Sequence, residues 1–121
     1  MRASKTAGSI VITTSAVAYT PEQSLPVYAA SKAALLGLIR SLRSVTATGE
    51  PSITINGIAP AATITSLLSP ELAEPIIAQG LPVSSAHFVG LALVYSATAM
   101  QDRRVEVYCR ESEALDKWKS G

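Results

Sequence analysis

Three side chains in the first third of the sequence have the types and the spacing that proton transfer requires. Tyr28 precedes Lys32 by four residues in "VYAASKAALLGLIRSL", and Ser15 lies thirteen residues before Tyr28. A free tyrosine has a pKa of about 10, so a tyrosine that acts near neutral pH needs its anion stabilised by roughly 4 kcal/mol. A lysine charge about 4 Å from a phenol oxygen supplies about 1 kcal/mol in water, but about 4 kcal/mol at an effective dielectric constant near 20. The pattern indicates an acid–base pair that works only where water is largely excluded.

The Tyr-x-x-x-Lys spacing alone is weak evidence. In a chain with four tyrosines and four lysines, such a pair arises by chance in roughly one case in eight. The alternative interpretation is two amphipathic side chains near one end of a helix. The small residues between them, "AAS", would however allow another molecule to approach the helix closely.

The elements that would position these residues are a strand and a helix. "SIVITT" (residues 9–14) is continuous, β-branched and apolar, as in a strand buried on both faces, and Ser15 follows its carboxyl end. A helix is predicted from Pro26 to about Ser44, because apolar residues recur at spacings of three and four, namely Leu35, Leu38, Ile39 and Leu42. One helical turn places Tyr28 and Lys32 on the same face.

Strands and helices continue to alternate along the chain. Residues 52–60 form a second β-branched strand, in which Asn56 is expected to bond backbone near the following loop. A short helix is predicted after Ser69, with Pro70 in its first turn and Gly80 just past its end. A third helix is predicted with Ser84 or Ser85 as its cap, "RRVEVYC" is a candidate third strand, and the structure of the tail 110–121 is left open. The alternation predicts an α/β fold with about three parallel strands and flanking helices, which is part of a doubly wound sheet.

Composition excludes several classes of function. The chain has 121 residues, 48% hydrophobic and 16% charged, with a formal charge of +1, so no basic patch indicates nucleic acid. No apolar run is long enough to span a bilayer. The single cysteine, Cys109, fits a reducing compartment, and we expect a cytoplasmic protein. Neither Cys109 nor the lone histidine, His87, has the companions that a metal site needs, so no metal is expected.

Three segments, in order, carry a family resemblance. "GSIVITTSAV", "PVYAASKAALLGLIRSL" and "ITINGIAPAATIT" resemble consecutive blocks of the short-chain dehydrogenase/reductase family. The resemblance implies that Tyr28 is the general acid/base, that Lys32 stands beside it and holds the nicotinamide ribose, and that Ser15 orients the substrate oxygen. It also implies a contact with the nicotinamide end of NAD or NADP by the loop after the second strand, namely Pro60, Ala61, the backbone at Thr63 and the hydroxyl of Thr65. Ala61 departs from the family pattern, which usually has glycine there.

The resemblance also implies that much of the family's fold precedes these segments. The seven glycines include no pair spaced as in the turn that cradles the pyrophosphate. We therefore expect residues 1–121 to be a single partial NAD(P)-binding Rossmann-type domain, truncated so that its N-terminal half is absent, with the start (1–8) and the tail (110–121) uncertain. The implied function is an NAD(P)-dependent oxidoreductase that interconverts an alcohol and a ketone or aldehyde. The truncation leaves open whether the chain is active alone.

A function of a different class is a non-catalytic association module. In the family, the helix that corresponds to Val27 to Leu42 commonly packs in subunit interfaces, so a fragment could form a homo-oligomer through this helix and lack catalysis. The segment between Thr65 and about Ser85 would set the substrate, and its apolar composition hints at a hydrophobic alcohol or ketone.

Overall fold

The strands form one central parallel sheet and one small parallel pair. The computed structural model describes residues 6–20, 22–47, 52–98 and 106–109. The central sheet has the order β1-β2-β5, from β1 (Gly8–Thr13), β2 (Ile53–Pro60) and β5 (Glu106–Cys109), and both of its pairings are parallel. The pair consists of β3 (Ala62–Ile64) and β4 (Val83–Ser85), also parallel. The predicted α/β fold with about three parallel strands is confirmed.

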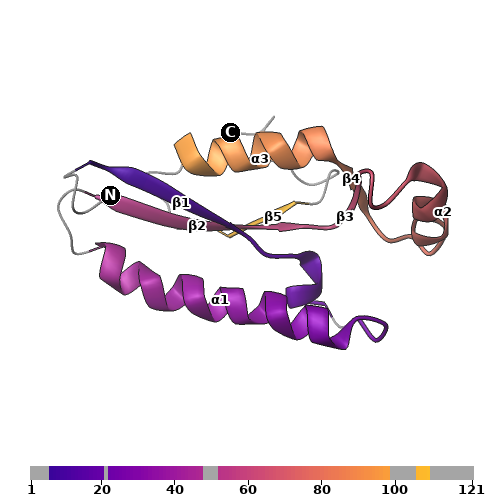
Figure 1. Ribbon diagram of the computed structural model, residues 1–121, viewed down its shortest axis with the longest axis horizontal. Helices are drawn as coiled ribbons and strands as arrows, with labels where there is room; N and C mark the ends of the chain where they lie inside the picture. The colour runs from indigo at the N-terminus through magenta and orange to yellow at the C-terminus, as the bar shows by residue number, and fades with distance from the viewer. Residues whose placement is uncertain (1–5, 21, 48–51, 99–105, 110–121) are drawn as a thin grey trace.

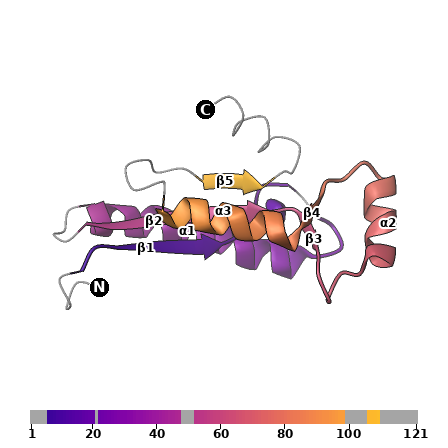
Figure 2. The ribbon, with the colours of Figure 1, turned by 90° about the horizontal axis from the view of Figure 1, so that it is seen from above.

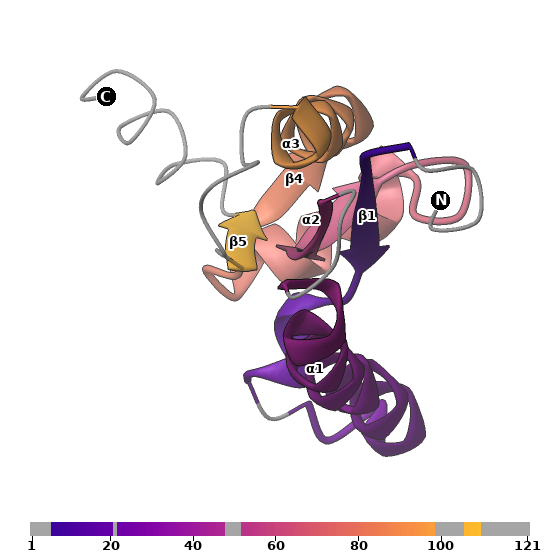
Figure 3. The same cartoon turned by 90° about the vertical axis from the view of Figure 1, so that its left-hand side faces the viewer.

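Two helices cover opposite faces of the central sheet. Figure 1 shows α1 (Pro26–Ala47) below the sheet and α3 (Ala86–Thr98) above it, and the end-on view of Figure 3 shows the same three layers. The shorter α2 (Pro70–Ala78) lies beyond the end of the sheet, next to β3 and β4 (Figure 2). Strands covered on both faces are buried and apolar throughout their length, as β2 (Ile53–Pro60) is. The prediction of a strand buried on both faces is wrong for β1, in which no residue is buried and Ile10 is 37% exposed, because β1 lies at the edge of the sheet that the structure describes.

Strand β2 is the centre of the core. It lies between β1 and β5, and all of its residues are buried except the half-buried Thr54. The helix α1 packs Leu36 (7% exposed) and Ile39 (0% exposed) toward the sheet. The apolar stripe predicted for this helix was therefore partly wrong, because Leu38 is 46% exposed. Leucine and isoleucine are so frequent here that spacing alone identified a helix but not its rotation about its own axis.

The structure adds three short elements that are not predicted from the sequence. The 3₁₀ helix η1 (Ala16–Ala18) follows β1 directly, and β3 and β4 are only three residues long each. The predicted short helix is present as α2, with Pro70 as its first residue; it ends before Gly80, whose φ of +71° favours glycine. Ser85 caps α3, since its Oγ accepts a hydrogen bond from the backbone N of Phe88 at 3.2 Å. The tail 110–121 lies outside the described residues.

Within the described residues, no helix combines the length and the apolar character that crossing a bilayer requires.

Candidate active site

The carboxyl ends of β1 and β2 lie together at one edge of the sheet. In Figure 1 this edge faces η1, the first turns of α1 and the small β3–β4 pair. The parallel register pairs Thr13, the last residue of β1, with Ile58. In open parallel sheets this is the edge where ligands bind, so the residues that follow the two strands form the candidate site.

Tyr28 and Lys32 meet in the first turns of α1, at this edge. The Lys32 Nζ atom lies 5.7 Å from the centre of the Tyr28 ring. The same ammonium donates a hydrogen bond of 3.2 Å to the backbone carbonyl oxygen of Thr13. Lys32 is half-buried, whereas Tyr28 is 43% exposed. The helix thus places the phenol and the ammonium one turn apart and ties the ammonium to the end of β1.

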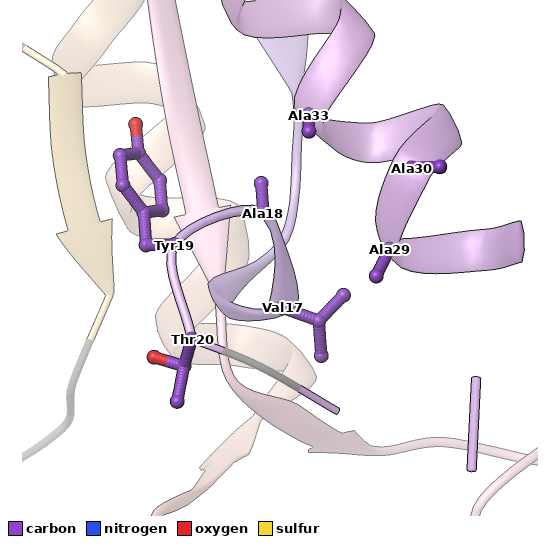
Figure 4. Close-up of a pocket in the computed structure, with 7 residues that line it drawn as sticks. All are labelled: Val17, Ala18, Tyr19, Thr20, Ala29, Ala30 and Ala33. Atoms are coloured by element: carbon purple, nitrogen blue, oxygen red, sulfur yellow. The ribbon is translucent and has the colours of Figure 1, made fainter. Parts of the chain in front are cut away.

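Ser15 lies two residues beyond the carbonyl that Lys32 contacts. It is the N-cap of η1, with an extended backbone (φ −162°), and its Oγ accepts a hydrogen bond from the backbone N of Val17 at 3.4 Å. An oxygen used as an acceptor keeps its own O–H as a donor. Residues of η1, of the segment after it and of α1 line a shallow, open hollow of about 320 Å³ (Figure 4). The lining residues are Val17, Ala18, Tyr19, Thr20, Ala29, Ala30 and Ala33. The side chains that line this hollow are small or apolar, apart from Tyr19 and Thr20.

The predicted cofactor loop follows β2 at the same edge. Pro60 is buried at the end of β2, and Ala61 is half-buried between β2 and β3. The hydroxyl of Thr63 donates to the carbonyl of Ala61 at 3.0 Å. Thr65 is exposed, and its Oγ1 accepts hydrogen bonds from the backbone N atoms of Leu67 (3.2 Å) and Leu68 (3.4 Å). These bonds fold the chain into a turn and leave the Thr65 O–H free to donate.

The donors at this edge fit the nicotinamide and ribose end of a dinucleotide. An ammonium has three N–H donors, and Lys32 uses one of them on Thr13, which leaves two for ribose hydroxyls. The Thr65 hydroxyl accepts two backbone hydrogen bonds and keeps one O–H donor, which a carbonyl oxygen such as that of a carboxamide would accept. The pyrophosphate end does not fit the described residues, because the single glycine with positive φ among them is Gly80, at the end of α2 rather than between a strand and a helix.

The electrostatic coupling of the pair depends strongly on its surroundings. A unit positive charge about 4 Å from a phenolate oxygen stabilises that anion by about 1 kcal/mol in water and by about 4 kcal/mol at an effective dielectric constant near 20. Because Tyr28 is 43% exposed, the pair lies near the water limit in this chain. In the described part of the chain, no group of three His, Cys, Asp or Glu side chains could hold a metal ion in its place.

Comparison with known sequences assigns the family. A family model described as short chain dehydrogenase matches residues 1–75. The short-chain dehydrogenase/reductase prx4 of Penicillium roqueforti is 56% identical over 120 residues, which cover 98% of this chain and 36% of prx4. The short-chain dehydrogenase/reductase ATR7 of Stachybotrys chlorohalonatus is 50% identical over 113 residues, covering 93% of this chain and 35% of ATR7. The chain belongs to the short-chain dehydrogenase/reductase family, and it spans about a third of the length of these relatives.

Comparison with solved structures agrees with the fold. A 7α-hydroxysteroid dehydrogenase complexed with NADH and 7-oxo glycochenodeoxycholic acid superposes with a TM-score of 0.70 at 23% identity, covering 90% of this chain and 45% of that one. Acetoin dehydrogenase YohF of Salmonella typhimurium gives 0.68 at 24% identity, covering 93% and 45%. The prediction of a partial Rossmann-type sheet is confirmed, and the chain resembles NAD(P)-dependent oxidoreductases.

Two buried polar residues at the sheet differ from the sequence-based expectations. Thr14 was not predicted to be part of the site, and Asn56 was assigned a different backbone partner. Thr14, 2% exposed, donates through its Oγ1 to the carbonyl oxygen of Ile58, 44 residues away. Asn56 (1% exposed) does bond backbone, as predicted, but its Nδ2 donates to the carbonyl of Ser96 in α3 at 3.2 Å rather than to the following loop. The only signal for Thr14 was a polar β-branched residue between an apolar strand and Ser15.

Proposed function

We propose that this chain carries the proton-transfer half of an NAD(P)-dependent oxidoreductase that interconverts a small-molecule alcohol and a ketone or aldehyde. The observation that carries the proposal is the Lys32 ammonium, which lies 5.7 Å from the Tyr28 ring while bonded to the end of β1. The pair lies at the ligand-binding edge of a parallel sheet in a chain of the short-chain dehydrogenase/reductase family. Residues 1–121 are proposed to act as one partial nucleotide-binding domain in the cytoplasm.

Each residue has a proposed role that the family resemblance implies and that its position at this edge supports. The Tyr28 hydroxyl gives a proton to the carbonyl oxygen in reduction and takes it back in oxidation. The Lys32 ammonium stabilises the tyrosine anion and holds the ribose, and the Ser15 hydroxyl donates to the same substrate oxygen. Pro60, Ala61, Thr63 and Thr65 border the nicotinamide end of the cofactor. When bound, the nicotinamide supplies or accepts the hydride.

The remaining length of the relatives supplies what this edge lacks. A lysine charge about 4 Å from a phenolate stabilises it by about 1 kcal/mol in water, and by about 4 kcal/mol only when water is largely excluded. A dinucleotide and a further protein layer over the exposed Tyr28 would do this. We therefore expect full activity from the chain joined to those parts of prx4 that it does not span, and weak or no nucleotide binding from the chain alone.

The test compares Tyr28→Phe with a second tyrosine, Tyr95, which is 51% exposed on α3. In the prx4 chimera, Tyr28→Phe should lower kcat for oxidation of apolar alcohols by about 10²- to 10⁴-fold. NADH and NADPH affinity, measured by calorimetry, should change little. The Tyr95→Phe control should leave turnover and affinity unchanged. Turnover that survives Tyr28→Phe within about twofold would refute the proposed role of Tyr28.

Association through α1 is a second proposal, and the exposure of its outer face favours it. Val27 is 81% exposed and Leu38 is 46% exposed. At 3.6 residues per turn, residues 27, 34 and 38 share one face, with the exposed Ala34 between the two larger side chains. An apolar stripe of this kind fits a second copy of the same helix. Sedimentation of the chain and of a Val27→Ser, Leu38→Ser variant tests it: a module of this type forms oligomers that the variant loses, and shows no turnover with Tyr28 or with Phe at that position.

A further inference from the structure

The carbonyl oxygen of Ile58 receives two hydrogen bonds from one residue. The backbone N of Thr14 and the Thr14 Oγ1 both donate to it, each at 2.8 Å. Ile58 is 0% exposed and Thr14 is 2% exposed, so both bonds lie in the core. The backbone bond continues the β1–β2 ladder by one residue, and the hydroxyl bond occupies the second lone pair of the same oxygen.

These two hydrogen bonds from Thr14 fix the positions of the residues before and after it. Thr13, before it, presents the carbonyl that accepts the Lys32 ammonium at 3.2 Å. Ser15, after it, begins η1. On the other strand, Ile58 lies two residues before Pro60, where the candidate cofactor loop begins. One buried side chain therefore connects all three segments of the candidate site.

We propose that Thr14 is a positioning residue: its hydroxyl fixes the Thr13 carbonyl as the acceptor that holds the Lys32 ammonium beside Tyr28. The proposal deepens the proposed function and rests on it for its catalytic consequence. Lys32 has a long, flexible stem that would otherwise sample many rotamers. The Thr13 carbonyl belongs to the peptide that leads into Thr14, and Thr14 is held by two hydrogen bonds. This carbonyl therefore gives the Lys32 ammonium one fixed contact, and the two other N–H donors of the ammonium remain available.

A purely structural role for Thr14 makes a different prediction. If the Thr14 hydroxyl only forms a hydrogen bond that stabilises the core, its loss would destabilise the sheet. It would leave the environment of Lys32 unchanged in the molecules that remain folded. If it positions Lys32, the ammonium itself should respond. The readout must therefore be a property of the Lys32 amine in folded protein rather than stability or turnover.

The rate at which Lys32 is acetylated provides this readout. Acetylation requires the Lys32 nitrogen to leave its contact with the Thr13 carbonyl and meet the reagent, so an amine held in that contact reacts more slowly than one that is free to move. Brief acetylation followed by peptide mass spectrometry reports each lysine separately, with the chain's three other lysines as internal references. The variants are Thr14→Val, which keeps the shape and removes the hydroxyl, and Thr14→Ser, which restores it.

Thr54→Val is the matched control. Thr54 lies in β2 at the opposite end of the same strand pair, and its Oγ1 donates to the Ser9 Oγ across the strands at 3.0 Å. Like Thr14→Val, it removes one threonine hydroxyl from a bond between β1 and β2. It lies far along both strands from Thr13 and Ile58.

We expect Thr14→Val to raise the acetylation rate of Lys32 by about three- to tenfold relative to the other lysines, and Thr14→Ser and Thr54→Val to leave it within about twofold. An unchanged Lys32 rate in folded Thr14→Val would overturn the proposal. If Thr14→Val does not fold, the unsubstituted chain decides: the acetylation rate of Lys32 must rise when the chain is unfolded in urea, and an unchanged rate would refute the held ammonium.

Labelling separates this proposal from the proposed function. It needs neither nucleotide nor turnover, so it can succeed where the chimera is inactive. In an active chimera, Thr14→Val should lower kcat with little change in KM and should displace the pH profile of kcat, and Thr14→Ser should restore both. If Thr14→Val changes the labelling of Lys32 but not the pH profile of kcat, the positioning of Lys32 by Thr14 is supported and its catalytic consequence is refuted.

Discussion

Truncating Ile39 tests whether α1 is seated on the sheet as the structure shows. Ile39 is 0% exposed and lies seven residues after Lys32, so both residues share the face of α1 that meets the sheet. Leu36 (7% exposed) lies between them on this face. The burial of Ile39 thus supports the same helix surface that carries Lys32 to Thr13.

The expected cost of Ile39→Ala follows from its complete burial. The substitution removes three carbon atoms, worth about 0.8 kcal/mol each in transfer from water, or roughly 2.4 kcal/mol. The cavity that remains adds to this, within the range of about 2–5 kcal/mol found for such truncations. The better helix propensity of alanine returns a few tenths of a kcal/mol. We expect a loss of about 3 kcal/mol in the free energy of unfolding.

The neighbouring residue supplies the control. Leu38 is 46% exposed on the same helix, and Leu38→Ala should cost less than about 1 kcal/mol. Urea unfolding followed by far-ultraviolet circular dichroism measures both, and an unchanged dependence on urea shows that the same surface is exposed in each variant. Equal costs for the two substitutions would mean that α1 is not seated on the sheet by this face. The placement of Tyr28 and Lys32 at the end of β1 would then lose its support.

Two further predictions concern charged side chains. Arg43 lies four residues beyond Ile39, and within the described part of the chain its Nε and Nη2 atoms are buried without a hydrogen-bond partner. Arg43→Met should therefore raise the free energy of unfolding by about 1 kcal/mol or more, against a change within about 0.5 kcal/mol for the exposed Arg40→Met; a loss relative to Arg40→Met would contradict this. The hydrogen bond from the Ser69 side chain holds the pKa of Glu71 below its usual 4.5, so ionised Glu71 stabilises the fold above about pH 4.5, and this contribution is lost as the pH falls through the lower folded-state value. Urea midpoints from pH 7 to pH 3 should fall more steeply for the parent than for Glu71→Gln, and parallel curves would refute it.

The elements that carry the site were predictable because their signals are local. "SIVITT" and "SITINGIAP" are continuous β-branched runs, and they are the two strands whose carboxyl ends form the candidate edge. Pro26 marks the first residue of α1, as predicted. Since a helix fixes the relation of residues four apart, the approach of Lys32 to Tyr28 followed from the spacing alone. The roles of Ser15, Tyr28, Lys32 and the loop from Pro60 to Thr65 remain proposals.

The unpredicted features depend on contacts between distant segments. The bond from Thr14 to Ile58 spans 44 residues, and no local pattern specifies which carbonyl a buried hydroxyl will meet. Strands β3 and β4 are three residues long and pair with each other although α2 separates them in the sequence. The rotation of α1 was mistaken for a related reason. Leucines occupy several of its faces, so only packing against β2 decides that Leu36 is buried and Leu38 exposed.

The placement of the reactive groups and the dielectric constant around them are separate requirements for proton transfer. One β–α–β unit, from β1 through α1 to the end of β2, places a hydroxyl, a phenol, an ammonium and the candidate cofactor loop at one edge. That unit leaves Tyr28 43% exposed, and exposure to water reduces the coupling between two charges about 4 Å apart from about 4 to about 1 kcal/mol. The difference, about 3 kcal/mol, corresponds to roughly 150-fold in an equilibrium constant. Residues 8–65 can therefore place the reactive groups and still give little activity until Tyr28 is shielded from water. For this reason the chimera, rather than the chain alone, is the preparation in which activity should be measured.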